Sequence, residues 1–372
     1  MTSKRLTAWW GGIWCPHCGY PLLRGGNPGA LMLVLRDVQK TDLPGLKRLA
    51  AVLNTVNLPN NEETLEAIID KSVKSFSGKV KNPFEREFLF VLEDVRNELI
   101  IGTSMIIAQH GTYESPHIYL DVSEREHYSA SIGRHFRHKV LSIGYNYEGP
   151  TEIGGRVVDP PYRATPDKPG KQLSYVRFLF MAMHKRLFRP RVLAELLPPL
   201  LPDGRSLLWE ACGKKFTGLT YQEADRLSRQ NKEFIKELFP SSDVYASLFP
   251  ERVQKVLGEV GPNTQGVQRM LERIGFRYVE RIDPFDGGPH FEANLSDITL
   301  VRRYRTVKLA EEDFELEGDN LLVAYERESG RNRFRAVRTT GRLDDKNAYL
   351  PARTKELLDV PAGAKVSIIP FD

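Results

Sequence analysis

The chain has 372 residues, of which 41% are hydrophobic and 27% are charged, and its formal net charge is +5. This length is sufficient for two or three domains, and the composition is typical of a soluble globular protein. The basic residues are scattered and no apolar run reaches the ~18 residues of a membrane span, which argues against nucleic-acid and membrane partners. Three cysteines are too few for a disulfide framework, so we expect a cytoplasmic protein.

The first 31 residues differ in character from the rest of the chain. Cys15 and Cys18 have half the spacing of a zinc ribbon, but a closed structural site needs four ligands and the only other cysteine is Cys212. We therefore expect residues 1–31 to be a leader that is disordered or not native, and we predict no metal site. The alternative interpretation of Cys15 and Cys18 is that they belong to a zinc-bearing nucleic-acid module.

The opening of the remaining chain predicts a β-α-α-β-β order. Leu33-Val34-Leu35-Arg36 alternates like a strand, and Asp42-Leu43-Pro44 begins a helix. Residues 60–76 have apolar residues at helical spacing, and residues 88–93 and 99–107 read as two strands joined by a short turn. This order is typical of the first half of an acetyltransferase-type fold.

The second part of the chain alternates between strands and helices. We predict strands at 140–147, 151–158 and 192–195, and helices at 173–188, 222–239 and 264–274. A strand beginning at Phe276 returns through the turn Asp286-Gly287-Gly288-Pro289, where glycine allows the backbone to approach a ligand closely. Short alternating runs after Leu309 predict a small β appendage.

These elements predict an α+β fold of the acetyltransferase-like class with a small C-terminal β domain. We assign residues 32–308 to an acyl-CoA N-acyltransferase region and residues 309–372 to the β domain. The larger region could consist of two fused acetyltransferase-type halves, 32–150 and 151–308.

The segment between the strand at 151–158 and the helix that follows predicts a phosphate-binding loop. In acetyltransferase-type folds, loop N–H groups and the helix N-terminus hold the CoA pyrophosphate. Here Gly170 offers an unobstructed amide, and positive charge comes from Arg163, Lys168 and Lys171. The backbone of residues 156–158 would pair with the pantetheine arm like an added strand. The alternative is an ordinary helix N-terminus with a solvated basic loop.

Many short motifs, in the correct order from Met32 to about Val307, resemble the arginine N-succinyltransferase family. They include Leu58-Pro59, Phe90-Val91-Leu92-Glu93-Asp94, Arg177-Phe178-Leu179-Phe180, Trp209-Glu210 and Phe285-Asp286-Gly287-Gly288-Pro289. The resemblance implies transfer of a succinyl group from succinyl-CoA to the α-amine of arginine, or of a related amino acid, by direct attack of the amine on the thioester. It also implies a succinyl-CoA contact at Arg156, beside Val157 and Val158, no permanently bound cofactor, and a homo- or hetero-oligomer.

One residue of the family's chemistry is missing. The family has a proton-donor histidine in a Gly-x-Val-His-Pro segment, and the matching segment here has Gly261, which cannot transfer a proton. We therefore consider His290, Glu259 and Tyr221 as catalytic candidates. The structural alternatives are a turn histidine, a helix-face carboxylate and a buried tyrosine.

A second departure lies on the substrate side. The family has Ala-Glu-Met-Arg-Gly where this chain has Leu197 in place of the arginine. A guanidinium substrate needs carboxylates, for which Glu152, Glu195 and Asp286 are candidates, although each also reads as a strand-end or turn residue. The alternative function is a non-catalytic or altered-specificity member of the family that binds an acyl-CoA or a partner subunit.

Overall fold

The computed structural model describes residues 31–53, 58–228, 231–314, 317–330 and 332–372. The leader, with Cys15 and Cys18, therefore lies outside the described residues. Within the described part of the chain, no helix has the length and apolar character to cross a membrane. The one cysteine in that part, Cys212, is buried and unpaired.

The described strands form one fifteen-stranded sheet in the order β12-β15-β11-β14-β13-β1-β2-β3-β6-β7-β10-β9-β4-β5-β8. The strands are β1 (Leu33–Asp37), β2 (Glu87–Asp94), β3 (Leu99–Ile107), β4 (His117–Ser129), β5 (Arg134–Asn146), β6 (Thr151–Val158), β7 (Arg191–Glu195), β8 (Val244–Tyr245), β9 (Arg277–Ile282), β10 (Pro289–Asn294), β11 (Arg305–Leu309), β12 (Asp319–Glu326), β13 (Phe334–Leu343), β14 (Asn347–Tyr349) and β15 (Lys365–Pro370).

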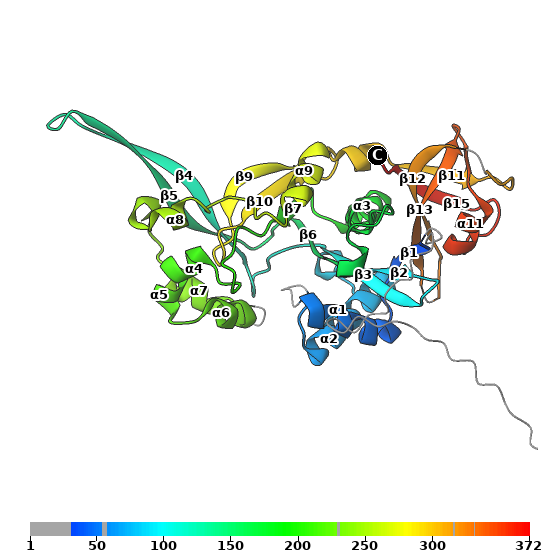
Figure 1. Cartoon of the computed structure of the whole chain (residues 1–372), viewed down its shortest axis with the longest axis horizontal. Coiled ribbons are helices and arrows are strands. Elements are labelled where there is room, and N and C mark those ends of the chain that lie inside the picture. Colours follow the sequence, from blue (N-terminus) through cyan, green and yellow to red (C-terminus); the bar gives the residue numbers. More distant parts are fainter. Residues whose placement is uncertain (1–30, 54–57, 229–230, 315–316, 331) are drawn as a thin grey trace, which may run out of the picture.

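Helices cover both faces of the sheet (Figure 1). They are α1 (Leu43–Leu53), α2 (Glu62–Phe76), α3 (Pro169–Met183), α4 (Leu207–Ala211), α5 (Gly213–Thr217), α6 (Tyr221–Ser228), α7 (Glu233–Leu238), α8 (Glu251–Gln254), α9 (Gln265–Arg273), α10 (Thr299–Arg302) and α11 (Ala352–Leu358).

Strand β2 explains why helices are needed on both faces. Its residues 88–92 are apolar without interruption, and side chains alternate between the faces of a strand, so neither face can be left in water. Phe88 and Phe90 belong to the core that contains α3, whereas Leu89 and Val91 belong to the core that contains α1 and α2. Helix α3 is buried around most of its circumference, as expected of a helix that is apolar on nearly every side.

Most predicted elements are present, with differences at their ends. Helix α3 begins at Pro169, four residues before the predicted start, because proline is well suited to the first turn of a helix. The helix predicted over 222–239 is divided into α6 and α7. Strand β4 was not predicted, although it pairs with β5 over thirteen residues in a hairpin that projects from the body (Figure 1).

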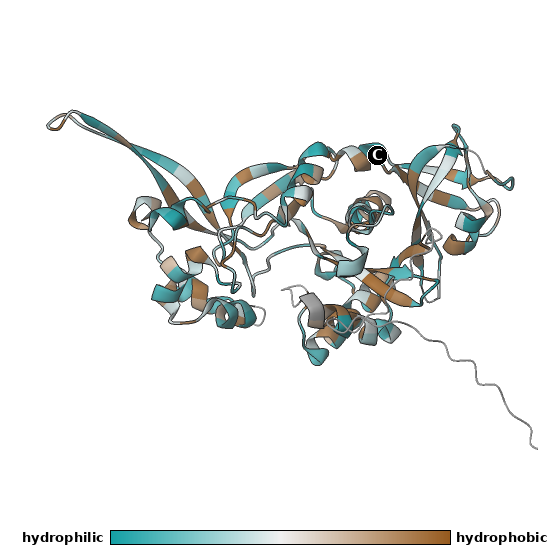
Figure 2. Cartoon of the chain, in the orientation of Figure 1, coloured by the Kyte–Doolittle hydropathy of each residue, from teal (hydrophilic) through white to brown (hydrophobic). Residues whose placement is uncertain are grey.

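The β4–β5 hairpin escaped prediction because most of it has no core to face. Its residues 123–137 are largely exposed and carry many charged side chains, and hydrophilic residues predominate along the projecting arms (Figure 2). At the other end of the sheet, β11–β15 and α11 surround an apolar cluster of their own. Strand β13 joins that cluster to the rest of the sheet by pairing with β1, with Leu35 opposite Ala336.

Candidate active site

The site is built where two neighbouring parallel strands part. Strands β6 and β7 pair only at Thr151–Val192 and Glu152–Leu193. Beyond those pairs, residues 153–158 of β6 have no strand partner on the β7 side among the described strands. Glu195 ends β7 beside this opening, and the pairing of β7 with β10 places His290 opposite it.

Two further histidines reach the same place from the connection between β3 and β4. His110 lies in that connection and His117 begins β4, and their ring centroids are 4.5 Å apart. Gly111 makes the approach possible, because its φ is +92° and a Cβ there would lie 2.6 Å from the His117 amide nitrogen. The amide of His110 donates to the carbonyl oxygen of Pro150, which holds the connection against the start of β6.

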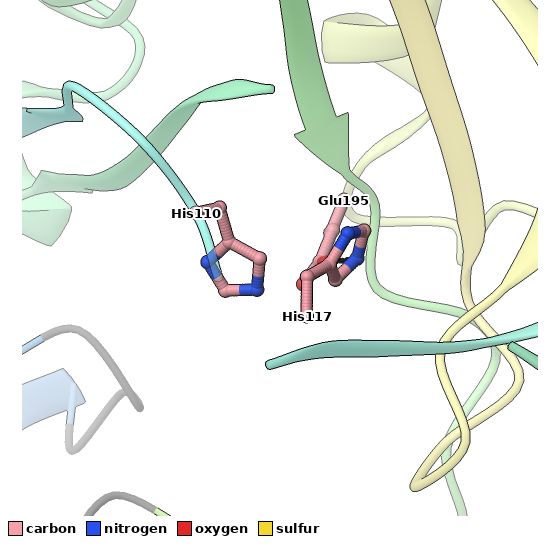
Figure 3. A group of neighbouring side chains, drawn as sticks. All are labelled: His110, His117 and Glu195. Atoms are coloured by element: carbon pink, nitrogen blue, oxygen red, sulfur yellow. Dashed lines mark ion pairs between the residues drawn. The ribbon is translucent and has the colours of Figure 1, made fainter. Parts of the chain in front are cut away.

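Glu195 lies between the imidazoles in a group that we call the histidine cluster (His110, His117, His290 and Glu195; Figure 3 shows all but His290). Its Oε1 is 3.3 Å from His117 Nε2 and 3.5 Å from His290 Nε2. The two histidine side chains are 2% and 0% exposed, and none of their ring nitrogens makes a hydrogen bond of good geometry. Because buried polar atoms are nearly always paired, this arrangement indicates a ligand-binding or catalytic role.

The electrostatics leave the cluster unprotonated near neutral pH. Burial lowers the pKa of His117 to about 3 and also lowers that of His290, so both imidazoles are neutral at pH 7. Burial alone would raise the pKa of Glu195, but the neighbouring imidazoles, His117 foremost, hold it below the usual range. Glu195 is 29% exposed, so this ionised carboxylate is the part of the cluster that a substrate can reach.

A turn with two acids, the half-buried Asp283 and the buried Asp286, adjoins the cluster. Asp283 Oδ1 accepts the amide N–H groups of Phe285 and Asp286, and Asp286 Oδ1 accepts that of Gly288. Burial, with the charge of Glu195, raises the pKa of Asp283 to about 7, and burial with the charge of Asp283 raises the pKa of Asp286 well above its usual value. Two carboxyl groups this close and this buried favour binding of a cation.

Cationic side chains occupy the other side of the opening, and we call Arg156, Arg163 and Arg177 the arginine group. Arg177 of α3 is 3% exposed and donates only to the carbonyl oxygens of Gly154 and Ser174, both at 3.3 Å. No carboxylate among the described residues pairs with it, and burial with the charge of Arg156 lowers its pKa to about 9. A buried guanidinium without an acidic partner is costly, which points to an anionic ligand.

The predicted phosphate-binding residues are only partly brought together. The Arg156 guanidinium lies over the start of α3, where a Cβ on Gly170 would be 2.9 Å from its Nη1. Arg163 donates through Nε to the carbonyl oxygen of Val158. Lys168 precedes α3 with a left-handed backbone, whereas Lys171 turns away to contact the carbonyl oxygen of Asp372. The side chains of Val157 and Val158 are buried, so only their backbone faces the opening.

The other two predicted catalytic residues, Tyr221 and Glu259, lie outside the histidine cluster. Tyr221 begins α6 and packs beside Trp209, and burial with the charge of Asp286 raises its pKa well above the usual value. Glu259 is exposed and lines a separate cavity of about 580 Å³ together with Tyr278 and Phe291. Glu152, predicted as a substrate ligand, instead holds His110 Nδ1 at 2.6 Å.

The two departures from the family pattern touch each other. The amide of Gly261 donates to the carbonyl oxygen of Leu197 at 2.8 Å, and a Cβ on Gly261 would lie 2.6 Å from that of Pro198. A histidine at position 261 would therefore need the 196–198 segment to move. The two positions are therefore in backbone contact, and the space that a side chain at 261 would use is closed.

Sequence reasoning missed His110, His117, Asp283 and Arg177. A signal was available only for Arg177, which is a charged residue within the apolar helix α3. The histidines lie on a connection and on a strand that had not been predicted, so nothing local indicated that they meet His290.

Most of this chain is similar to known proteins. Residues 33–300 match the model of a family described as arginine N-succinyltransferase beta subunit. Arginine N-succinyltransferase of Yersinia pestis (strain Pestoides F) is 32% identical over 346 residues, covering 91% of this chain and 97% of the relative. The enzyme of the same name from Shigella boydii serotype 18 is 31% identical over 343 residues, again covering 91% and 97%.

A solved structure, that of arginine/ornithine succinyltransferase subunit AI from Pseudomonas aeruginosa, superposes with a TM-score of 0.79 at 30% identity. It covers 92% of this chain and 100% of that one. The fold is thus the acetyltransferase-like arrangement of mixed helices and strands that the sequence predicted. The family model matches more than two thirds of this chain, and the curated relatives are matched over nearly all of their own length. This chain therefore belongs to the arginine N-succinyltransferase family.

Proposed function

We propose that this protein transfers a succinyl group from succinyl-CoA to the α-amine of arginine, or of a related amino acid. The observation that carries the proposal is the β6–β7 opening, with a carboxylate base on one side and unpaired guanidinium groups on the other. The amine attacks the thioester directly. Cys212 is no nucleophile, because it is buried in an apolar cluster and burial raises the pKa of its thiol to about 11.

The histidine cluster supplies the base. An α-amino group is mostly protonated near neutral pH and must lose a proton before it can attack. Glu195 is ionised and accessible, and the neutral imidazoles of His117 and His290 can share the proton that it accepts. In this assignment His290 acts through Glu195, and the missing histidine at position 261 is not required.

The acyl donor lies along the open edge of β6. The unpaired backbone of residues 153–158 can pair with the pantetheine arm as an added strand. The start of α3 at Gly170, with Arg156, Arg163 and Lys168, then receives the phosphates. Lys171 is left out of this assignment because it contacts the C-terminus.

Arg177 is assigned to the far carboxylate of the succinyl group. Its guanidinium lies at Gly154, where β6 and β7 have parted, and it has only two long bonds to carbonyl oxygens. A carboxylate would satisfy it bidentately and compensate for its burial. An acetyl group could not do so, which makes this residue a determinant of donor specificity.

The side chain of the amino acid is assigned to the acidic turn. Asp283 and Asp286 have raised pKa values because they are buried close to one another and to Glu195. A guanidinium or ammonium group between them would favour the ionised forms and relieve the repulsion. Glu152, already engaged with His110, would contribute through that histidine.

Release of the CoA thiol tests the proposal. Purified protein is assayed with succinyl-CoA or acetyl-CoA, with arginine, with ornithine or without an amine. We expect release that requires both succinyl-CoA and an amino acid and is lost in Glu195→Gln. Glu326→Gln is the matched control, since Glu326 makes a similar contact with His184 at 2.7 Å outside the site. Absence of amine-dependent release would favour the alternative of a non-catalytic member that binds an acyl-CoA or a partner.

We also propose that the protein is an oligomer in the cytoplasm, with the β4–β5 hairpin at a subunit contact. The hairpin projects from the body and exposes Tyr128, Ile132 and Phe136 by 70%, 62% and 45%. Such apolar groups on a projecting arm favour burial against a partner. Light scattering should give a smaller particle for Ile132→Ser with Phe136→Ser, and an unchanged mass would contradict this role.

Finally, we propose that residues 309–372 form a separate β domain, supported by the apolar cluster that β11–β15 and α11 enclose. The division of 32–308 into halves stays a prediction. Strand β6 pairs with β3 across the 150/151 boundary, so the two ranges are not expected to fold apart. Limited proteolysis should release the β domain before it cuts between residues 150 and 151.

A further inference from the structure

The unusual property of the histidine cluster is that its donor atoms converge without partners. Ligand atoms of His110, His117 and Glu195 all lie within 4.8 Å of one another, and a second group of Glu195, Asp283 and His290 meets the same limit. Glu195 is common to both. All four ring nitrogens of His117 and His290 are buried without a hydrogen bond, which is a costly arrangement unless something occupies the space between them.

The orientation of His110 is that of a metal ligand with its outer support in place. Its Nδ1 is 2.6 Å from Glu152 Oε2, so the Nδ1 proton is donated to that carboxylate and the lone pair on Nε2 is left available. Figure 3 shows the other edge of the ring facing His117 and Glu195. Histidine ligands of metal ions usually donate their second nitrogen to a carboxylate in this way.

The distances suit a small transition-metal ion. Ligand atoms ~2.0–2.1 Å from a tetrahedral zinc ion are roughly 3.3 Å from one another. Glu195 Oε1 is 3.3 Å from His117 Nε2 and 3.5 Å from His290 Nε2. His110 belongs to the same group of convergent ligand atoms as His117 and Glu195, whereas His290 meets Glu195 in a second group. Two imidazoles and one carboxylate select zinc or its first-row neighbours over magnesium and calcium, which prefer oxygen.

We propose that this chain carries a binding site for a divalent transition-metal ion of the zinc class, with His110, His117 and Glu195 as ligands and Glu152 as the outer support of His110. The site departs from the expectation, drawn from the sequence, that the chain holds no metal. It does not depend on the proposed acyl transfer, because binding is measured without substrate. A metal on Glu195 would remove that carboxylate from proton transfer, so occupancy and turnover are expected to exclude each other.

The experiment must separate this site from the cysteine pair of the leader. The full-length chain carrying Cys15→Ser and Cys18→Ser is stripped with a chelator, dialysed and titrated with Co²⁺, whose visible absorption reports tetrahedral nitrogen and oxygen ligands. Zn²⁺ is then measured by displacement of Co²⁺. We expect one equivalent per chain. A metal that binds only when Cys15 and Cys18 are present would overturn the proposal.

Variants locate the ion. His110→Gln and Glu195→Gln should each weaken binding at least 100-fold, and Glu152→Gln about 10- to 100-fold, as for other outer-shell partners. The control is His184→Gln, because His184 is also a half-buried histidine paired with a carboxylate, that of Glu326. This variant should bind the metal ion as tightly as the parent does. His110 and Glu195 are partly exposed at 19% and 29%, and circular dichroism of each variant confirms that it is folded. Equal affinity in all four variants would exclude the assigned ligands.

Discussion

The two sides of the β6–β7 opening are built in contrasting ways. The histidine cluster combines three imidazoles with a carboxylate, supplied by the β3–β4 connection, β4, β7 and β10. The arginine group is carried by β6, α3 and the loop between them, without a carboxylate for Arg177. One side can accept protons or cations, and the other can accept anions.

The contrast also concerns how far each side follows the family. Arg177 lies in the core helix α3 and in a motif that resembles the family, whereas Gly261 stands where the family's proton-donor histidine was expected. The anion side is therefore part of the packed scaffold. The base side lies on connections and strand ends, where residues can change without loss of the core.

The largest effect that we expect comes from Glu195→Gln. It keeps the shape of the side chain but removes the base, so turnover should fall by about 100- to 10,000-fold while KM for succinyl-CoA changes little. Steady-state kinetics of thiol release measure both quantities. Turnover within twofold of the parent would show that proton transfer does not use this carboxylate.

Arg177→Met tests the opposite side. Loss of the charge-assisted contact should lower kcat/KM for succinyl-CoA by about 10- to 100-fold and leave kcat/KM for acetyl-CoA unchanged. The preference for succinyl-CoA over acetyl-CoA should therefore decrease. Arg333→Met is the control, because Arg333 also donates only to backbone carbonyl oxygens, those of Arg327 and Phe76. If Arg177→Met lowers kcat/KM equally for succinyl-CoA and acetyl-CoA, Arg177 has only a structural role.

The Gly261→His variant tests whether the family's proton-donor histidine can be restored at this position. We expect a loss of about 1–3 kcal/mol in the free energy of unfolding and no gain in turnover, since the new side chain collides with the Pro198 carbonyl oxygen. Gly266→His is the comparison, because a Cβ there meets nothing within 4 Å. Chemical denaturation measures both. Increased activity in Gly261→His would mean that the 196–198 segment moves readily.

The smallest effect is a pH dependence of stability. Burial, with the charge of Glu195, raises the pKa of Asp283 to about 7, so the folded protein keeps a proton that the unfolded chain loses near pH 4. The contribution of this proton is complete below about pH 4 and is lost as the pH rises through 7. The Tm of Asp283→Asn relative to the parent should therefore increase steadily over that range.

The control for this titration is Asp344→Asn. Backbone N–H groups of Lys346 and Asn347 lower the pKa of Asp344 to about 2, so its contribution to stability is constant above about pH 4 and is lost only at lower pH. The Tm difference for Asp344→Asn should be flat between pH 4 and 7. A flat difference for Asp283→Asn as well would show that Asp283 is ionised throughout.

The sequence was a good guide where one face of an element is buried. Helix α2 begins after Asn61, whose side chain accepts the Thr64 amide, and β2 and β3 read directly from their apolar runs. His290, Glu195 and Asp286 were named as site candidates on other grounds, namely the resemblance to the family and the charge of a guanidinium substrate. Reasoning from buried faces failed for β4, whose outer half is exposed on both faces, because no periodicity marks such a strand.

The meeting of His110, His117 and His290 could not be read from the sequence for a different reason. His290 is distant in sequence from His110 and His117, and the meeting of the three residues depends on the register of β7 with β10 and on the tight connection at Gly111. Register is a property of the assembled sheet. The contact of Lys171 with Asp372, the last residue of the chain, could not be read from the sequence for the same reason.

The pairing of β1 with β13 has a consequence for synthesis of the protein. Strand β1 is among the first parts of the described chain to leave the ribosome, yet its partner at Ala336 is made about three hundred residues later. Until then a strand that is entirely buried in the folded protein, and apolar over residues 33–35, has one bare edge, which is the kind of surface that recruits wrong partners. We therefore expect nascent or truncated chains that end before residue 334 to be aggregation-prone and to need chaperone protection until the C-terminal strands arrive.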